Sequence, residues 1–400
     1  MTITSIKDVD VKGRTLVVRA DLNAPCKDGV VTDATRIERF AAGLKPLLDA
    51  GAKAVVLSHF GRPKGQRVPE MSLAPIAPAL AAALGRDVAF ADDCIGETAE
   101  AAAAALTEGQ VLLCENLRYH PEEEANDLGF AAKLARLGEL YVNDAFSAAH
   151  RAHASTAAIA SILPAYSGPL MDEETAALTA VLEAPKSPAV ALIGGAKVSS
   201  KIAVLKNLVK KVDAVIIGGG MANTFFFADG HAIGKSLCEE DQVDTVREIQ
   251  ELAKAANCEL VLPVDIVYAF KFADNARSFI AGVEDCPEEG IILDAGPKSV
   301  VRFRSVLANA QTILWNGPLG AFEMRPFEQA TKQVALEAAE LTRSGLVTSV
   351  AGGGDTVAAL NMAGVAEDFT YVSSAGGAFL EWLEGKELPG LAALDRAKAA

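Results

Sequence analysis

Short runs of consecutive apolar residues recur along the chain and alternate with longer segments of helical periodicity. Strands whose successive side chains are all apolar are buried on both faces, as in parallel sheets covered by helices. Repeated strand–helix units of this kind predict an α/β protein with two doubly wound, Rossmann-like parallel-sheet domains.

The individual elements can be assigned from these runs. Strands are expected at 16–19, 54–57, 88–90, 111–114 and 140–143 in the first half, and at 189–193, 214–217, 260–263, 312–315, 347–351 and 370–373 in the second. Helices are expected at 34–49, 73–84, 97–106, 201–211, 243–256 and 326–343.

The length of 400 residues exceeds what one core usually supports, which favours two domains. The turn-rich segment 164–169 precedes a helical pattern that ends near two prolines. We therefore expect a first domain at 1–171, an interdomain helix at 172–184, a second domain at 185–384, and a cleft between the domains. A helix in that position transmits motion as a lever. The sequence alone does not decide where residues 385–400 pack.

Composition narrows the class of protein. Apolar residues make up 50% and charged residues 22%, which is typical of globular domains. A net charge of −15 argues against nucleic-acid binding, so any anionic substrate must be small and bound by a local concentration of positive charge. The six cysteines form no Cys-x-x-Cys pair, and the N-terminus has no signal-peptide core. We expect a cytoplasmic protein with reduced thiols that binds no membrane.

The residues that follow the predicted strands differ between the two halves. In the first half, strands run into Arg and His, as in 17–23, 55–63 and 142–151; in the second, they run into glycine clusters at 192–197, 216–220 and 350–355. Ligands of parallel sheets bind beyond the carboxyl ends of the strands. Two half-sites for different anionic ligands are therefore predicted, an arrangement that suits transfer of a group between them.

The first half-site is defined by polar residues that share this position: Asp21, Asn23, Arg36, His59, Arg62, Arg118, His150 and Arg151. If Asp33 is a helix N-cap, Arg36 lies in the first turn, where a cation opposes the helix dipole. The alternative for Arg36 is a solvent-exposed side chain, and for Arg118 a surface ion pair with Glu115. His150 and His153 have metal-ligand spacing but no third ligand nearby. Several converging Arg residues indicate a ligand with two anionic groups, such as a carboxylate and a phosphate.

The second half-site carries neither common nucleotide-binding fingerprint. The glycines at 218–220 lack the third glycine of the dinucleotide pattern, and 194–201 is no Walker A loop. Lys197 and Lys201 would share one helix face if the helix begins at or before Lys197, and would then suit a phosphate chain; a solvated helix face is the alternative. Asp355 either caps a helix or, beside phosphates, holds Mg²⁺.

Taken together, these segments resemble the phosphoglycerate kinase family nearly from end to end. The similarity rests on eight segments: 19–23, 58–63, 115–118, 144–155, 194–201, 218–222, 315–320 and 352–356. It implies Mg²⁺-dependent phosphoryl transfer between ATP and 3-phosphoglycerate, with 1,3-bisphosphoglycerate and ADP as products, by a monomeric enzyme that bends at a hinge. It also implies that 385–400 packs back on the first domain.

The resemblance assigns roles to matching positions. Phosphoglycerate would contact Asp21, Leu22, Asn23, Arg36, His59, Phe60, Gly61, Arg62, Arg118 and Arg151. ATP or ADP would contact Lys201, Gly219, Glu323 (at the ribose), Gly353, Gly354, Asp355 and Thr356, with Mg²⁺ on Asp355. Catalytic positions would be Arg36, Lys197, Lys201, Gly352 and Gly376, with Arg36 and Lys197 flanking the phosphoryl group. The chain departs from the family at Ala295, Ala321, Ser374 and Ala375; Ala375 would cost about 1 kcal/mol if its φ were positive.

The residue types are consistent with phosphoryl transfer to a carboxylate even when the family resemblance is set aside. A carboxylate acceptor is ionised at neutral pH and needs no general base, and no Asp–His base pair is evident. Two alternatives stay open at this point. A two-domain binding protein would keep both pockets without turnover, and a related kinase would phosphorylate another small carboxylic acid.

Overall fold

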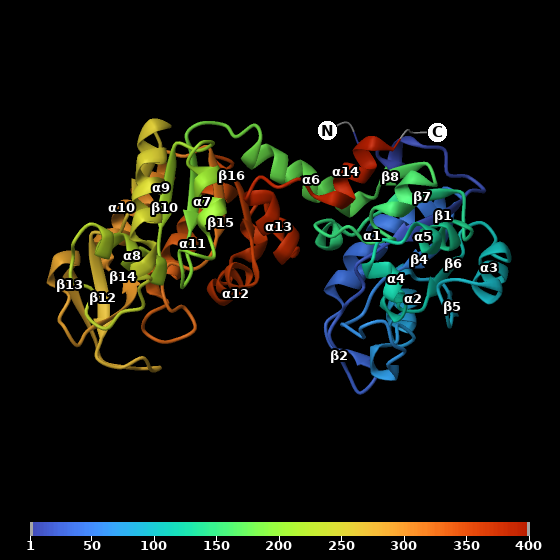
Figure 1. The fold of residues 1–400 in the computed structure, drawn as a ribbon, viewed down its shortest axis with the longest axis horizontal. Coiled ribbons are helices and arrows are strands. Elements are labelled where there is room, and N and C mark those ends of the chain that lie inside the picture. The colour runs from blue at the N-terminus through green and yellow to red at the C-terminus, as the bar shows by residue number, and fades with distance from the viewer. Residues whose placement is uncertain (1–2, 398–400) are drawn as a thin grey trace. The chain divides into compact units, whose positions relative to one another are not determined.

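The computed structural model describes residues 3–397, which form two compact units (Figure 1). Unit 1 holds the chain up to Thr175 and again from Glu387, and unit 2 holds Ala176–Lys386. The division falls within helix α6 (Pro169–Leu182). The N- and C-terminal segments therefore belong to the same unit.

Unit 1 is built on a six-stranded parallel sheet with the order β5-β6-β4-β1-β7-β8. The strands are β1 (Thr15–Arg19), β4 (Lys53–Leu57), β5 (Val88–Ala91), β6 (Val111–Cys114), β7 (Leu140–Asn143) and β8 (Ala165–Ser167). Their apolar runs are long enough to pair along their length; Val17 of β1, for example, lies opposite Val55 and Tyr141. Strand β1, the first in the chain, lies in the middle of the sheet between β4 and β7.

Helices cover both faces of this sheet. Leu16 and Val18 belong to a core cluster with residues of α1 (Thr35–Asp49) and α2 (Ile76–Leu84). Val17 points into a second cluster, which includes residues of α3 (Glu97–Ala104) and α5 (Leu128–Ala135). Alternating side chains thus face opposite cores, which is why the strand is apolar throughout.

Shorter elements complete unit 1. They are η1 (Ile6–Asp8), β2 (Cys26–Lys27), β3 (Val30–Val31), η2 (Pro69–Met71), η3 (Leu117–Tyr119), α4 (Pro121–Glu124), η4 (Phe146–Ala148), η5 (Ala158–Ser161) and α14 (Pro389–Arg396). Helix α14 packs here because Leu394 joins the second core cluster and the Gly390 amide donates to the Ala149 carbonyl at 2.8 Å.

Unit 2 contains a second six-stranded parallel sheet, ordered β11-β10-β9-β15-β16-β17. The strands are β9 (Ala189–Ile193), β10 (Ala214–Ile217), β11 (Glu259–Val261), β15 (Thr312–Asn316), β16 (Thr348–Gly352) and β17 (Tyr371–Ser373). A core cluster joins this sheet to α10 (Pro297–Ala308), α11 (Gln329–Arg343) and α12 (Gly354–Ala363). The remaining helices are α7 (Ile202–Leu208), α8 (Gly220–Ala228), α9 (Val243–Ala255), α13 (Gly376–Leu383), η6 (Glu240–Gln242), η7 (Val283–Asp285) and η8 (Ala366–Asp368).

The prediction of parallel-sheet α/β domains is confirmed, with three local corrections. Unit 2 also has an antiparallel sheet, β13 (Ser278–Gly282)-β12 (Asp265–Ala269)-β14 (Ile291–Ala295), which was not predicted. Strand β11 ends at Val261, two residues before the expected end at a proline that has no amide to donate. The N-cap position of α1 is Ala34 instead of Asp33, although the Asp33 carboxylate accepts from the Thr35 amide at 2.9 Å.

A buried aspartate holds the start of α6. Asp144, which directly follows β7, accepts from the Leu170 and Met171 amides at 2.7 and 3.1 Å. A Cβ at Gly168 would lie 2.3 Å from its Oδ1, so this approach requires glycine. Burial raises the pKa of Asp144 to about 7, although the two amide bonds oppose that shift.

Candidate active site

In unit 1, the loops after four neighbouring strands meet at one end of the sheet. Strands β6, β4, β1 and β7 are consecutive in the sheet, and the predicted anion-binding residues follow them or begin α1. Asp21, Leu22 and Asn23 follow β1; His59, Phe60, Gly61 and Arg62 follow β4; Arg118 lies in η3 after β6; and Arg151 follows β7 and η4. The parallel topology therefore brings these segments together.

Arg36 is fixed by a carboxylate from the loop after β1. It lies in the first turn of α1, as predicted, and its Nη1 donates to Asp21 Oδ2 at 2.9 Å. Ser147 Oγ donates to the same oxygen at 2.6 Å. The Arg36 side chain is still 39% exposed, so its remaining donors can reach a ligand. Leu22, by contrast, is fully buried in the core, which leaves only its main chain for binding.

Hydrogen bonds join the loop after β4 to its neighbours. The Gly61 amide donates to Asn23 Oδ1 at 3.1 Å, and Arg118 Nη1 donates to the Gly61 carbonyl at 2.8 Å. The Asn116 side chain accepts from the Phe60 amide and donates to the Phe60 carbonyl. These bonds hold the loop before any ligand arrives.

His59 is oriented by Arg19, a residue whose side chain is fully buried at the end of β1. Arg19 Nη2 lies 3.0 Å from His59 Nδ1, and because the guanidinium can only donate, Nδ1 is the acceptor. Burial and the neighbouring Arg19 and Arg118 lower the pKa of His59 well below its usual value. A neutral ring with Nδ1 as acceptor carries its proton on Nε2, which makes His59 a hydrogen-bond donor.

Glu123 is the buried carboxylate behind Arg19. It accepts from Ser155 Oγ at 2.5 Å and from the Ser155 amide at 2.9 Å, while Arg19 Nε donates to Ser155 Oγ at 2.9 Å. His153 Nδ1 lies 3.7 Å from the carboxylate. Burial alone would raise the pKa of Glu123, but His153, Arg19 and Ser155 outweigh it and lower the pKa. Sequence reasoning missed this residue.

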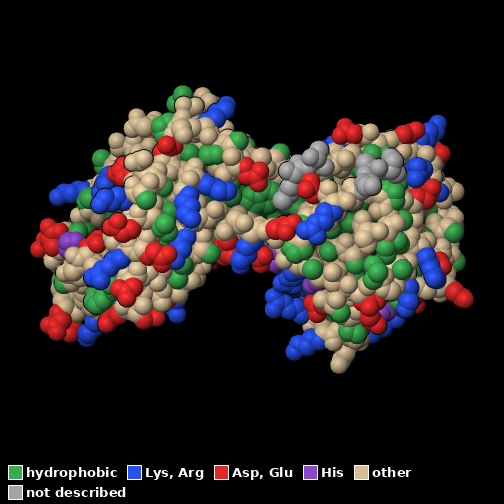
Figure 2. Space-filling view, turned by 45° about the horizontal axis from the view of Figure 1, so that its top comes forward, with side chains coloured by type: hydrophobic (Ala, Val, Ile, Leu, Met, Phe, Trp, Pro, Cys, Tyr) green, Lys and Arg blue, Asp and Glu red, His purple; other side chains and the backbone are tan. Residues whose placement is uncertain are grey.

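The remaining arginines extend the positive surface. Arg62 is exposed, and Arg151 Nε donates to His150 Nε2 at 3.1 Å. In the space-filling view, Lys, Arg and His side chains gather at one edge of unit 1 (Figure 2). Unit 1 therefore has a concentration of positive charge despite the acidic chain as a whole.

In unit 2, glycine-rich loops follow four adjacent strands. Gly194 follows β9, Gly219 follows β10, Gly317 follows β15, and Gly353 follows β16. Gly219 and Gly353 are the N-cap residues of α8 and α12, with φ of 69° and 99°. A Cβ at Gly194 would lie 1.8 Å from the Pro318 carbonyl oxygen, so the loops approach closely only because they lack side chains.

Three polar side chains join these loops. Lys201 Nζ donates to Asn316 Oδ1, and Asn316 Nδ2 donates to the Gly352 carbonyl at 2.7 Å. The Gly317 amide donates to Thr356 Oγ1 at 2.8 Å. Burial lowers the pKa of Lys201, although Asp355 and Glu384 oppose the shift. Asn316, at the end of β15, was missed because an amide in a buried strand resembles a structural residue.

Other predicted positions lie on separate segments of unit 2. Lys197 and Asp355 are exposed, the former in the loop after β9 and the latter in the first turn of α12. Because α7 begins only at Ile202, close to the expected start at 201, the condition under which Lys197 and Lys201 would share a helix face is not met. Glu323 is exposed in the turn after Gly320, and Gly376 begins α13.

The departure from the family pattern at Ala375 causes no backbone strain. Its φ is −93°, which any L-residue adopts, so the cost expected for a positive φ does not arise. It lies directly before α13, and its amide donates to Ser373 Oγ at 3.2 Å. Within residues 3–397, no helix is long and apolar enough to cross a membrane.

Each of the two α/β units contains a parallel sheet. Arginines gather after the strands of one sheet and glycines after the strands of the other, which defines a phosphotransferase of the two-domain kinase class. The sequence profile described as "Phosphoglycerate kinase" matches residues 6–386. The chain belongs to the phosphoglycerate kinase family, which confirms the resemblance found in the sequence.

Curated relatives and solved structures agree. A phosphoglycerate kinase of Methylobacterium radiotolerans is 58% identical over 97% of both chains, and one of Rhodopseudomonas palustris is 55% identical over 98% of both. The structure of phosphoglycerate kinase from Coxiella burnetii matches with a TM-score of 0.93 at 40% identity, covering 99% of this chain and 100% of that one. The Pyrococcus horikoshii enzyme matches with a TM-score of 0.79 at 29% identity, over 98% of each chain.

Proposed function

We propose that unit 1 binds 3-phosphoglycerate, that unit 2 binds ATP or ADP, and that the two units together transfer the terminal phosphoryl group. The reaction is that of the family, ATP:3-phospho-D-glycerate 1-phosphotransfer. The observation that carries the residue assignment is the segregation of side chains: arginines gather at the strand ends of one sheet, glycines and lysines at those of the other.

In the proposed phosphoglycerate site, each polar group has a distinct task. Arg36, Arg118 and Arg151 neutralise the phosphate and carboxylate of the substrate, and the exposed Arg62 adds a further cation. His59 donates from Nε2. Further contacts come from Asp21, Asn23 and the main chain of Leu22, Phe60 and Gly61.

The proposed nucleotide site uses the amides at the starts of α8 and α12. Gly219, Gly353 and Gly354 allow a phosphate chain to approach these helix N-termini, and Thr356 lies in the first turn of α12. Lys201 then adds positive charge, and Glu323 binds the ribose hydroxyls.

Asp355 is the proposed protein ligand of Mg²⁺. Its carboxylate is exposed at the glycine-rich start of α12. One carboxylate together with substrate phosphates and water is a usual donor set for this ion, so the residue fits. Bound Mg²⁺ would neutralise phosphate charge.

Transfer then needs positioning and electrostatic stabilisation, and no proton has to be removed. The substrate carboxylate is ionised at neutral pH and attacks the γ-phosphorus directly, while ADP leaves. Arg36 of unit 1 and Lys197 of unit 2 stabilise the equatorial oxygens, with main-chain amides at Gly352 and Gly376. Because these groups belong to different units, we propose that transfer requires domain closure, which also excludes water from the acyl phosphate.

The assay that tests this function traps the product. The protein is incubated with Mg·ATP and a candidate acid, and hydroxylamine converts any acyl phosphate to a hydroxamate. Product with 3-phosphoglycerate alone supports the proposal, and product with another acid supports a different carboxylate kinase. No product with any acid would mean a binding protein. We also propose a cytoplasmic monomer; a sedimentation mass near twice that of the 41.6 kDa chain would contradict the monomer.

A further inference from the structure

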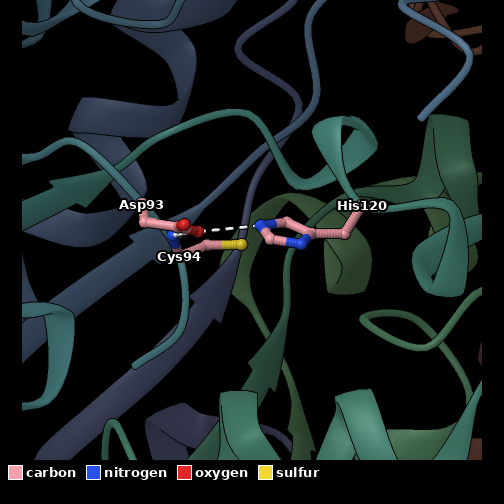
Figure 3. Close-up of side chains that lie close together, drawn as sticks. All are labelled: Asp93, Cys94 and His120. Atoms are coloured by element: carbon pink, nitrogen blue, oxygen red, sulfur yellow. Dashed lines mark hydrogen bonds and ion pairs between the residues drawn. The ribbon is translucent and has the colours of Figure 1, made fainter. Parts of the chain in front are cut away.

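We infer that unit 1 carries a binding site for a transition-metal ion of the Zn²⁺ class, formed by Asp93, Cys94 and His120. One donor atom from each residue lies within 4.8 Å of the other two. Within the described part of the chain, this is the one group of three or more Cys, His, Asp and Glu side chains that comes this close. Figure 3 shows the Cys94 sulfur beside the imidazole of His120, with Asp93 bonded to the same ring.

Two separate segments bring these donors together. Asp93 and Cys94 lie in the turn between β5 and α3, and His120 lies between η3 and α4. Strands β5 and β6, which precede the two segments, are neighbours in the sheet. The sheet therefore positions residues that are far apart in sequence, which explains why no ligand spacing was visible in the chain.

The imidazole is already oriented. His120 Nε2 lies 2.8 Å from Asp93 Oδ1, and the His120 ring packs against Phe130 with centroids 5.1 Å apart. Asp93 Oδ1 also accepts from the Cys94 amide at 2.6 Å. An ion would take the place of the proton between Asp93 and His120. These two side chains therefore need to move little to become ligands.

The donor types select the ion. Thiolate, imidazole and carboxylate together favour Zn²⁺, Co²⁺ and related ions over Mg²⁺ and Ca²⁺, which prefer oxygen. Zinc–ligand bonds are about 2.0–2.3 Å, so the sulfur has to approach its partners by up to about 1 Å. Three protein ligands leave one position of a tetrahedral ion for water.

The Cys94 thiol is buried. Cys94 is only 1% exposed, and burial, with Cys114, Asp93 and Glu123 nearby, raises its pKa well above the usual value. An ion of the Zn²⁺ class binds cysteine as the thiolate, so binding at this site releases a proton.

The candidate metal site adjoins the arginines of the proposed phosphoglycerate site. His120 follows Arg118 by two residues, and Arg118 donates to Gly61. Arg67 donates to the Asp92 carbonyl, and its guanidinium lies over the Tyr119 ring at 5.9 Å. Contraction around an ion would pull on the segment that carries Arg118, so we expect weaker phosphoglycerate binding. This coupling rests on the proposed function, whereas metal binding does not.

Co²⁺ is the probe that tests the site, because its spectrum reports its ligands. We expect the metal-free, reduced full-length protein to bind one Co²⁺, with a sulfur-to-cobalt charge-transfer band and strong tetrahedral visible bands that Zn²⁺ abolishes. Cys94→Ser should lose the charge-transfer band, and His120→Gln should weaken binding at least tenfold. Cys286→Ser, which changes a buried cysteine of unit 2, is the matched control and should bind as the wild type does.

Two further measurements keep the outcomes separate. Asp93→Asn, at a partly exposed residue, should weaken Co²⁺ binding about tenfold even if Cys94→Ser fails to fold. Absence of the charge-transfer band in the wild type, or its persistence in Cys94→Ser, overturns the site. Calorimetric binding of 3-phosphoglycerate without nucleotide should be several-fold weaker with one equivalent of Zn²⁺. Unchanged affinity refutes the coupling alone, and no phosphoglycerate binding by the metal-free protein refutes the proposed function.

Discussion

Replacement of Glu123 by Gln tests how the arginine-rich end of unit 1 is held together. Both Glu123 and Arg19 are fully buried, and Ser155 Oγ bridges them through bonds of 2.5 and 2.9 Å. Gln keeps the size of the side chain and removes its charge. The variant therefore isolates the electrostatic contribution of the carboxylate.

The two bonds place the Glu123 and Arg19 charges within roughly 5.5 Å of each other, where opposite unit charges attract by ~3 kcal/mol at an effective dielectric constant of about 20. Gln can still accept one bond from Ser155, but Arg19 is left without its nearest buried counter-charge. We expect the free energy of unfolding of unit 1 to fall by about 3 kcal/mol, at the lower end of the ~3–5 kcal/mol lost when one partner of a buried pair is removed.

Urea unfolding at neutral pH, followed by circular dichroism, measures this loss. Glu122→Gln is the control, because it makes the same chemical change at an exposed neighbour and should alter the free energy by less than about 0.5 kcal/mol. The wild type should also lose stability relative to Glu123→Gln as pH falls below about 4.5, since the folded pKa of Glu123 is lowered. Equal stability of the two Gln variants at neutral pH would refute the reasoning.

Three other substitutions test the proposed roles. Glu323→Gln should raise the KM for ATP about tenfold with little change in kcat, because one charged hydrogen bond to the ribose is lost; an unchanged KM contradicts the role. Asp355→Asn should raise the Mg²⁺ concentration for half-maximal velocity by roughly tenfold, and a superimposable Mg²⁺ titration would exclude Asp355 as the ligand. For Asp144, the folded pKa is about 7, above its unfolded value, so its contribution to stability is fullest at acidic pH and is lost as pH rises through about 7. The wild type should therefore lose on the order of 4 kcal/mol relative to Asp144→Asn between about pH 4 and pH 7, and parallel stability profiles would show that Asp144 does not titrate in this range.

The sequence predicted the parallel sheets because their strands are apolar on both faces. β6, β7, β9 and β10 have the predicted bounds. The antiparallel sheet escaped because its strands mix exposed and buried positions; Ile280 of β13, for instance, is 63% exposed. Such strands lack the continuous apolar run that identifies a strand buried on both faces.

Residues that hold the binding residues in place were harder to predict than the binding residues themselves. Arg36 could be found because a cation in the first turn of a helix opposes the helix dipole. Arg118 could be found because it follows a predicted strand. Glu123 lies within a run of three glutamates, which normally indicates a solvated surface, and only the fold shows that its middle member points inward. The helix expected at 201–211 does begin near that point, at Ile202, so Lys197 lies in the loop before α7.

The central claim is that one arginine of unit 1 and one lysine of unit 2 act on the same phosphoryl group. Its most direct test measures the rate of phosphoryl transfer from ATP to 3-phosphoglycerate in Arg36→Ala and Lys197→Ala, with Lys45→Ala and Lys210→Ala as controls at exposed lysines of the same two units. Each of the first two variants should lower kcat at least ~100-fold, and the controls should leave it unchanged. Near-normal turnover in either Arg36→Ala or Lys197→Ala would contradict the account.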